Sequence, residues 1–158
     1  MKRIIAYLSV FLVVLVYVLT LDLQGLLPEW LGTVQLPFRC ILAGGFGGGV
    51  YCLRGIYLNA CVRKQWDGDW WPWYYIRPLV SLVCGGVSFI FLKAGLLLLE
   101  SAGSRPDATQ LGYLALAFIA GLNVDKFIAK VEDIAQATWG IEKSRVSREN
   151  FEERKTRQ

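Results

Sequence analysis

Long apolar runs, separated by short polar segments, dominate this chain and predict membrane-spanning helices. The first run, from Ile4 to Leu21, carries no charge and follows the basic pair Lys2-Arg3. At 1.5 Å per residue, about 20 apolar residues cross the roughly 30 Å hydrocarbon layer of a bilayer. A cleaved signal peptide is the alternative, but the run exceeds the usual hydrophobic region and no small-x-small cleavage site follows it. We therefore expect a retained anchor.

Three further apolar runs predict three more spans. The uncharged part of the last one, residues 111–124, gives only about 21 Å of helix. Either residues 108–110 complete this span on one side, or Asn123 and Asp125 enter the membrane on the other. The predicted fold is an all-α membrane protein with four transmembrane helices in a domain of residues 1–129, at about 4–21, 36–58, 78–99 and 109–128.

The second run differs from the others in the glycines at its centre, residues 43–49. In lipid, small residues allow two helix backbones to approach closely. A nucleotide-binding glycine loop would need a preceding strand and a Gly-Lys-Ser/Thr ending, and neither is present. We expect helix packing and oligomerisation through one face, Gly44, Gly48, Cys52 and Gly55, and through the adjacent pair Gly45 and Gly49.

A cluster of aromatic residues separates the second and third runs. Trp and Tyr have an apolar body and a polar tip, so they settle at the membrane–water interface. We interpret the cluster as the turn of a membrane hairpin, with the third span beginning near Pro78, since proline suits a first helical turn. The predicted interface residues are Trp66, Trp70, Trp71, Trp73, Tyr74, Tyr75 and, near the carboxyl end, Trp139.

Four charged residues fall within or at the ends of the predicted spans: Arg39, Arg54, Lys93 and Asp125. Long basic side chains in such positions commonly extend to the headgroups, while an intramembrane acid is a candidate functional residue. Arg54 and Asp125 lie near the same end of their spans and share a depth. We therefore expect either that they pair or that each is solvated independently at the interface.

The distribution of basic residues predicts the orientation. Lys2 and Arg3, Arg63 and Lys64, and the basic tail all fall on one side of a four-span arrangement. The positive-inside rule then places both termini in the cytoplasm. The last span is expected to continue as a cytoplasmic helix, amphipathic to about residue 139, within a charged tail of residues 130–158. Candidate partner-binding residues of this tail are Lys143, Arg145 and Arg148.

Composition limits the chemistry. The chain is 54% hydrophobic and contains no histidine, which removes the commonest general base and metal ligand of neutral pH. The four cysteines stand singly and suggest small packing residues, and Asp67-Gly68-Asp69 lacks a third metal ligand. We predict no catalytic residue, no metal site, no cofactor and no enzymatic activity.

Two segments carry a resemblance to a known group of proteins. With the glycine-rich span and the aromatic hairpin, residues 120–127 and 139–145 resemble small multi-spanning inner-membrane proteins of bacterial anti-phage defence cassettes, retron-type effectors among them. The resemblance covers about residues 36–148 and includes no catalytic motif. It implies an effector or sensor of the bacterial inner membrane, often homo-oligomeric.

Two functions are accordingly expected as alternatives. The first is a membrane effector that oligomerises and perturbs or permeabilises the inner membrane on a cytoplasmic signal. The second is a sensor or accessory subunit that recruits a soluble cytoplasmic partner through its hairpin and tail. In both, the expected partners are the lipid bilayer, further copies of the chain and a cytoplasmic protein, while direct binding of nucleic acid is not expected.

Overall fold

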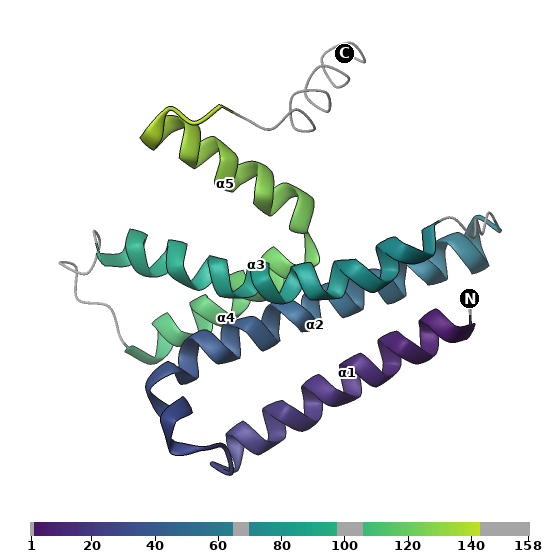
Figure 1. The fold of residues 1–158 in the computed structure, drawn as a ribbon, viewed down its shortest axis with the longest axis horizontal. Helices are drawn as coiled ribbons and strands as arrows, with labels where there is room; N and C mark the ends of the chain where they lie inside the picture. Colours follow the sequence, from purple (N-terminus) through teal and green to yellow (C-terminus); the bar gives the residue numbers. More distant parts are fainter. Residues whose placement is uncertain (1, 65–69, 98–105, 143–158) are drawn as a thin grey trace. The chain divides into compact units, whose positions relative to one another are not determined.

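The computed structural model describes residues 2–64, 70–97 and 106–142, and every regular element in these ranges is helical (Figure 1). The chain divides into two compact units, Met1–Val124 and Asp125–Gln158. The elements are α1 (Lys2–Leu23), the 3₁₀ segment η1 (Glu29–Val34), α2 (Gln35–Tyr57), the π-helical turn η2 (Leu58–Val62), α3 (Trp71–Leu97), α4 (Pro106–Leu122) and α5 (Val124–Trp139).

Three helical segments are long and apolar enough to cross a membrane: Lys2–Leu23, Leu31–Val62 and Trp71–Gly95. A fourth span results if Gln110–Leu122 and Val124–Trp139, which are separated by a break, count as one. The prediction of an all-helical membrane protein is therefore confirmed at the level of three to four candidate spans.

Helix α2 occupies the centre of the first unit and contacts α1, α3 and α4 (Figure 1). Its glycines make this possible, because they let neighbouring backbones approach. A Cβ atom at Gly44 would lie 2.7 Å from Gly85 Cα on α3, and one at Gly47 would lie 2.7 Å from Leu122 N on α4. A Cβ at Gly121 would overlap the Gly44 carbonyl oxygen. Three helices thus meet backbone to backbone.

Gly49 faces α1, whereas Gly45 lies between α1 and α3, where its Cβ would lie 2.5 Å from Leu82 Cδ2. A Cβ at Gly49 would lie 2.7 Å from Leu12 Cδ2, and one at Gly45 would lie 3.1 Å from Leu15 Cδ1. These neighbours are the ends of leucine side chains rather than backbone atoms. The contact of α1 with α2 is accordingly looser than the contacts of α3 and α4, and α1 buries only Ile4, Leu8, Leu15 and Asp22.

Two serines of α3 are fully buried in this unit. The Ser81 hydroxyl lies 2.9 Å from the Arg77 carbonyl oxygen and 3.0 Å from the Gly121 carbonyl oxygen, and the Ser88 hydroxyl donates to the Gly85 carbonyl oxygen at 2.7 Å. A hydroxyl small enough to fit between close helices finds its acceptor on a backbone, which avoids the cost of an unsatisfied buried group.

The start of the third helix differs from the prediction. Helix α3 begins at Trp71, so Pro78 lies inside it rather than in its first turn. The cause is packing: Tyr74 is only 3% exposed and joins an apolar cluster that draws its segment into the helix. The other members of that cluster are Ile4, Leu8, Cys52 and Ile56.

The last predicted helix is interrupted rather than continuous. Helix α4 ends at Leu122, and α5 begins at Val124. Asparagine at 123 competes for backbone hydrogen bonds and favours turns over helix interiors. The extension past the span therefore exists as a separate helix. Helix α5 is amphipathic, and Gly140, with a positive φ of 68°, follows its last residue. That this helix is a cytoplasmic extension of the span stays a prediction.

Candidate functional site

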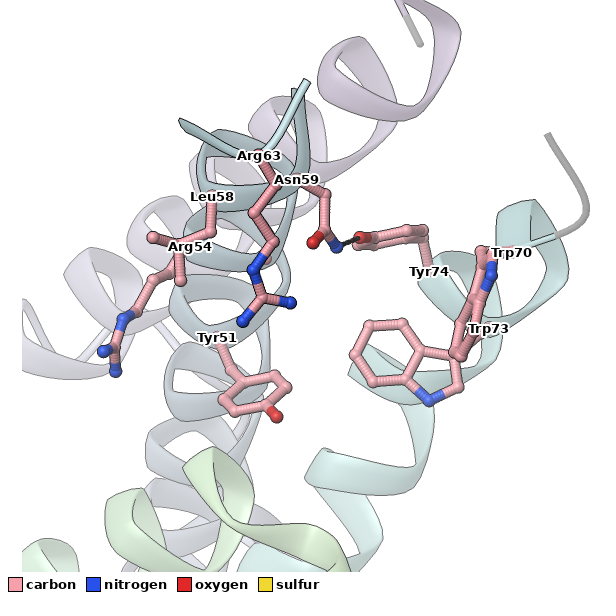
Figure 2. A pocket seen from close by; sticks show the side chains of 9 residues that line it. Tyr51, Arg54, Leu58, Asn59, Arg63, Trp70, Trp73 and Tyr74 are labelled. Atoms are coloured by element: carbon pink, nitrogen blue, oxygen red, sulfur yellow. Dashed lines mark hydrogen bonds between the residues drawn. The ribbon is translucent and has the colours of Figure 1, made fainter. Parts of the chain in front are cut away.

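A pocket of about 390 Å³ lies where α2 ends and α3 begins (Figure 2). Helix α2 and η2 contribute one wall, and the first residues of α3 contribute the other. The lining residues are Tyr51, Arg54, Gly55, Leu58, Asn59, Arg63, Trp70, Trp73 and Tyr74.

Helical spacing explains why these side chains converge. Residues 51, 54, 55, 58 and 59 recur three and four positions apart, so they share one side of α2 and η2. A Cβ at Gly55 would already contact the Tyr74 hydroxyl oxygen at 3.5 Å. Glycine at this position therefore keeps the space between the two walls open. The π-helical turn then adds one residue before Arg63, whose backbone N–H donates to the Leu58 carbonyl oxygen at 2.8 Å.

The two lining arginines are oriented differently. Figure 2 shows the Arg63 guanidinium extending toward Tyr51, whereas the Arg54 guanidinium points away from Trp73 and Tyr74. Asn59 Nδ2 donates to the Tyr74 hydroxyl oxygen at 3.4 Å and ties the two walls together. Arg63 is therefore the cation placed to meet a ligand in the pocket, and Arg54 lies at its rim.

A third arginine, Arg77, contacts two of the aromatic rings that line the pocket. The Arg77 guanidinium lies 4.4 Å from the centre of the Tyr51 ring and 4.8 Å from that of Trp73, and the residue is 6% exposed. The Tyr51 and Trp73 rings are 6.0 Å apart, and Trp73 meets Tyr74 edge to face at 5.0 Å. Cation–π and aromatic contacts of this kind fix the ring positions.

The pocket is rich in hydrogen-bond donors. Arginine guanidinium and tryptophan indole groups only donate, tyrosine hydroxyl and asparagine amide groups both donate and accept, and the lining residues include no carboxylate. The arrangement can therefore bind an anion through charge-assisted hydrogen bonds beside flat apolar surface.

Sequence reasoning missed two features of the first unit. Asp22 is 4% exposed, and Arg39 Nε donates to its Oδ2 at 2.5 Å while Gln35 Nε2 donates to its Oδ1 at 3.0 Å. Arg39 is therefore paired instead of extending to headgroups. The second feature is the contact of Arg77 with Trp73, which stands four residues before it, a helical spacing that places a cation near a ring.

The other predicted residues are dispersed. Gly44, Gly48, Cys52 and Gly55 lie on the side of α2 that faces α3 of the same chain, and their role between copies stays a prediction. Lys93 is exposed, with its ammonium 5.7 Å from the centre of the Phe89 ring. Asp125 and Trp139 belong to the second unit, so the pair Arg54–Asp125 also stays a prediction.

The predicted interface aromatics divide by burial. Trp70 and Trp71 are exposed, Trp73 and Tyr75 are half-buried, and Tyr74 is buried. Of the cysteines, Cys40, Cys52 and Cys84 are buried as expected of packing residues, but Cys61 is exposed because it lies on the outer side of the π-helical turn. Outside the described residues lie Trp66, the Asp67–Asp69 turn, Lys143, Arg145 and Arg148.

Comparisons give no relative from which a function could be transferred. No family model, curated protein or solved structure matches the chain. Within the described ranges, no group of three or more His, Cys, Asp or Glu side chains is arranged to hold a metal ion. The pocket at the end of α2 is therefore argued from its own geometry.

Proposed function

We propose that this protein is an effector of the bacterial inner membrane, acting in anti-phage defence, that assembles with further copies and permeabilises the bilayer on a cytoplasmic signal. The observation that carries the proposal is the contrast between an apolar outside and enclosed polar groups. Val10, Val13 and Val16 of α1 are exposed, as are Val83 and Ile90 of α3, which suits contact with lipid or another copy.

Within the part of the chain that the structure describes, the enclosed polar groups outline no aqueous path through a single copy. Ser81 and Ser88 are fully buried with backbone acceptors, and Asp22 is held by Arg39 and Gln35. Water-filled paths need polar lining or a gap between helices. Permeabilisation by this fold therefore requires a path between copies, which is why the proposal includes assembly.

The geometry also supports a cytoplasmic position for the pocket. Helix α1 runs antiparallel to α2, so Lys2 and Arg3 lie at the same end of the first unit as Arg63 and Lys64 (Figure 1). Basic residues gathered at one end favour the cytoplasmic side of a membrane. The pocket would then face the compartment from which the signal arrives.

Dye release from liposomes tests the proposal. The full chain is reconstituted into vesicles of phosphatidylethanolamine and phosphatidylglycerol loaded with a self-quenching dye, and release is followed as the protein density per vesicle is raised. We expect release to grow more steeply than in proportion to density, because a path between copies needs more than one chain. A strictly monomeric particle in detergent by mass contradicts the proposal, and no release at any density contradicts a path that assembly alone can open.

The second unit favours one alternative, a subunit that recruits a soluble partner. Helix α5 has an apolar face including Phe127, Val131 and Ile134, with Lys126 and Lys130 elsewhere on its surface. Such a helix can lie on a groove of a partner protein. Removal of residues 126–158 separates the two functions, since a recruiter would lose its activity in cells whereas a permeabilising effector would still collapse the membrane potential when overproduced.

A further inference from the structure

We propose that the pocket between α2 and α3 binds the phosphate group of an anionic phospholipid headgroup. The inference concerns a binding site on the membrane unit and does not depend on whether the protein permeabilises the bilayer. It rests on three features of the pocket: its donors, its depth relative to the apolar surface, and its size.

The donors select a ligand with acceptor oxygens. Arg63 extends into the space between the two walls, Arg54 lies at the rim, and Trp70 and Trp73 carry indole N–H groups that can only donate. Within the part of the chain that the structure describes, no ion pair engages Arg54 or Arg63 with a carboxylate. A phosphate, whose oxygens are all acceptors, complements this set.

The basic surroundings add to the attraction. Arg77 stands behind the Tyr51 and Trp73 rings, and the exposed Lys64 follows Arg63 directly. Arg77 contacts two rings that line the pocket, and Lys64 adjoins a lining residue along the chain, so both add positive charge near the site. A ligand with net negative charge is thus favoured over a zwitterionic one.

The depth of the pocket identifies a lipid as the source of the phosphate. Its residues lie at the end of the apolar segment Leu31–Val62 and at the start of Trp71–Gly95, both long enough to span a bilayer. Tryptophan and tyrosine at the ends of spans sit at headgroup level, where phospholipid phosphates are the most concentrated anions. The exposed Trp70 offers apolar surface beside the site for the glycerol and the first acyl carbons.

The size is suitable. Small-molecule pockets measure about 300–1,000 Å³, and this one measures about 390 Å³. It can accept one phosphate with its glycerol while the acyl chains stay outside. A larger soluble ligand would have to leave most of its surface exposed.

Thermal unfolding of the full chain in a nonionic detergent tests the proposal. Dioleoylphosphatidylglycerol, dioleoylphosphatidylcholine and glycerol 3-phosphate are titrated separately, and the midpoint temperature is recorded. Ligands that bind only the folded state raise this midpoint. We expect phosphatidylglycerol to raise it at the lowest concentration, because it combines the anion with an anchor in the same apolar environment.

The variant Arg63→Gln identifies the site. It should need about tenfold more phosphatidylglycerol for the same rise, as loss of one charge-assisted hydrogen bond predicts. Arg3→Gln is the matched control, since Arg3 is an exposed arginine at the same end of the unit but outside the pocket, and it should respond like the wild type. Equal responses of Arg63→Gln and Arg3→Gln overturn the assignment to this pocket.

The lipid arms decide the source. An equal rise with phosphatidylcholine contradicts an anionic headgroup, and an equal rise with glycerol 3-phosphate contradicts a lipid and assigns the pocket to a soluble phosphate compound. Native mass spectrometry of the wild type keeps the test independent of variant folding. One phosphatidylglycerol molecule should stay bound at collision energies that remove phosphatidylcholine, and removal of both at the same energy overturns the proposal.

Discussion

The two halves of α2 treat their polar and small residues in opposite ways. In the amino-terminal half, Arg39 is paired with a buried Asp22, and glycines bring α3 and α4 into backbone contact. Toward the carboxyl-terminal end, Arg54 and, beyond the helix, Arg63 are exposed and line a pocket. The difference teaches that a charge near a membrane span is structural where the chain supplies its partner, and available to a ligand where it does not.

The largest effect is expected where the backbones of α2 and α4 are in contact and leave no room for a side chain. Gly121→Leu would place a side chain on the Gly44 carbonyl oxygen. Because the neighbour is backbone rather than a flexible side chain, α4 must separate from α2, at a cost above about 3 kcal/mol. We expect little folded protein by size-exclusion chromatography in detergent.

Gly112→Leu provides the control on the same helix. A Cβ at Gly112 meets nothing within 4 Å. This variant should elute and unfold like the wild type. If both variants behave alike, the close approach of α2 and α4 is not what holds the unit together.

An intermediate effect is expected from the enclosed ion pair. Asp22→Ala leaves Arg39 and Gln35 without their acceptor in a site where the Asp22 side chain is 2% exposed. Breaking a buried pair costs about 3–5 kcal/mol, and the lower value applies here because the Arg39 side chain keeps 27% of its exposure. The measurement is unfolding by a denaturing detergent.

A double-mutant cycle sharpens this second prediction. Arg39→Met combined with Asp22→Ala should recover most of the loss, since an apolar pair avoids the uncompensated charge. Additive losses would mean that Arg39 and Asp22 act separately. Arg39 would then resemble the exposed arginines at the other end of α2.

The smallest effect is expected at the carboxyl-terminal end of α2, beside the pocket. Arg54→Gln removes an exposed charge for which no ion pair is seen with any other described residue. Without added lipid, its free energy of unfolding should stay within about 0.5 kcal/mol of the wild type, as for surface substitutions in general. A loss comparable to that of Asp22→Ala would erase the distinction between the two halves.

The sequence predicts the helices better than their ends. The apolar runs at 4–21 and 36–58 match helices α1 and α2 to within a few residues, since hydrophobic length is a local property. The sequence does not locate the start of α3. Tyr74 joins this helix because it packs on α1 and α2, and such tertiary contacts are not visible in the local sequence. The helix also breaks at Asn123, because asparagine favours turns over helix interiors. The apolar pattern continues past this position and does not predict the break.

The pairing of Arg39 with Asp22 was within reach of sequence reasoning, which considered only the pair Arg54 and Asp125. Equal depth suggested Arg54 with Asp125, while the same argument, applied to the opposite ends of the spans, joins Arg39 to Asp22. The pocket could not be foreseen, because it depends on two features. Trp73 and Tyr74 must belong to a helix, and the turn Leu58–Val62 must contain an additional residue. Each condition depends on tertiary contacts.

The π-helical turn Leu58–Val62 sets the phase of the helix end. A turn of this kind holds one residue more than an α-helical turn, and one residue corresponds to a rotation of about 100° around the axis. Arg63 follows the turn directly. Deleting Ala60, Cys61 or Val62, which do not line the pocket, would keep every lining side chain in the sequence but rotate this guanidinium to a different side of the helix. The direction of the cation is therefore encoded by the number of residues before it, and a change in length would act as a change in chemistry.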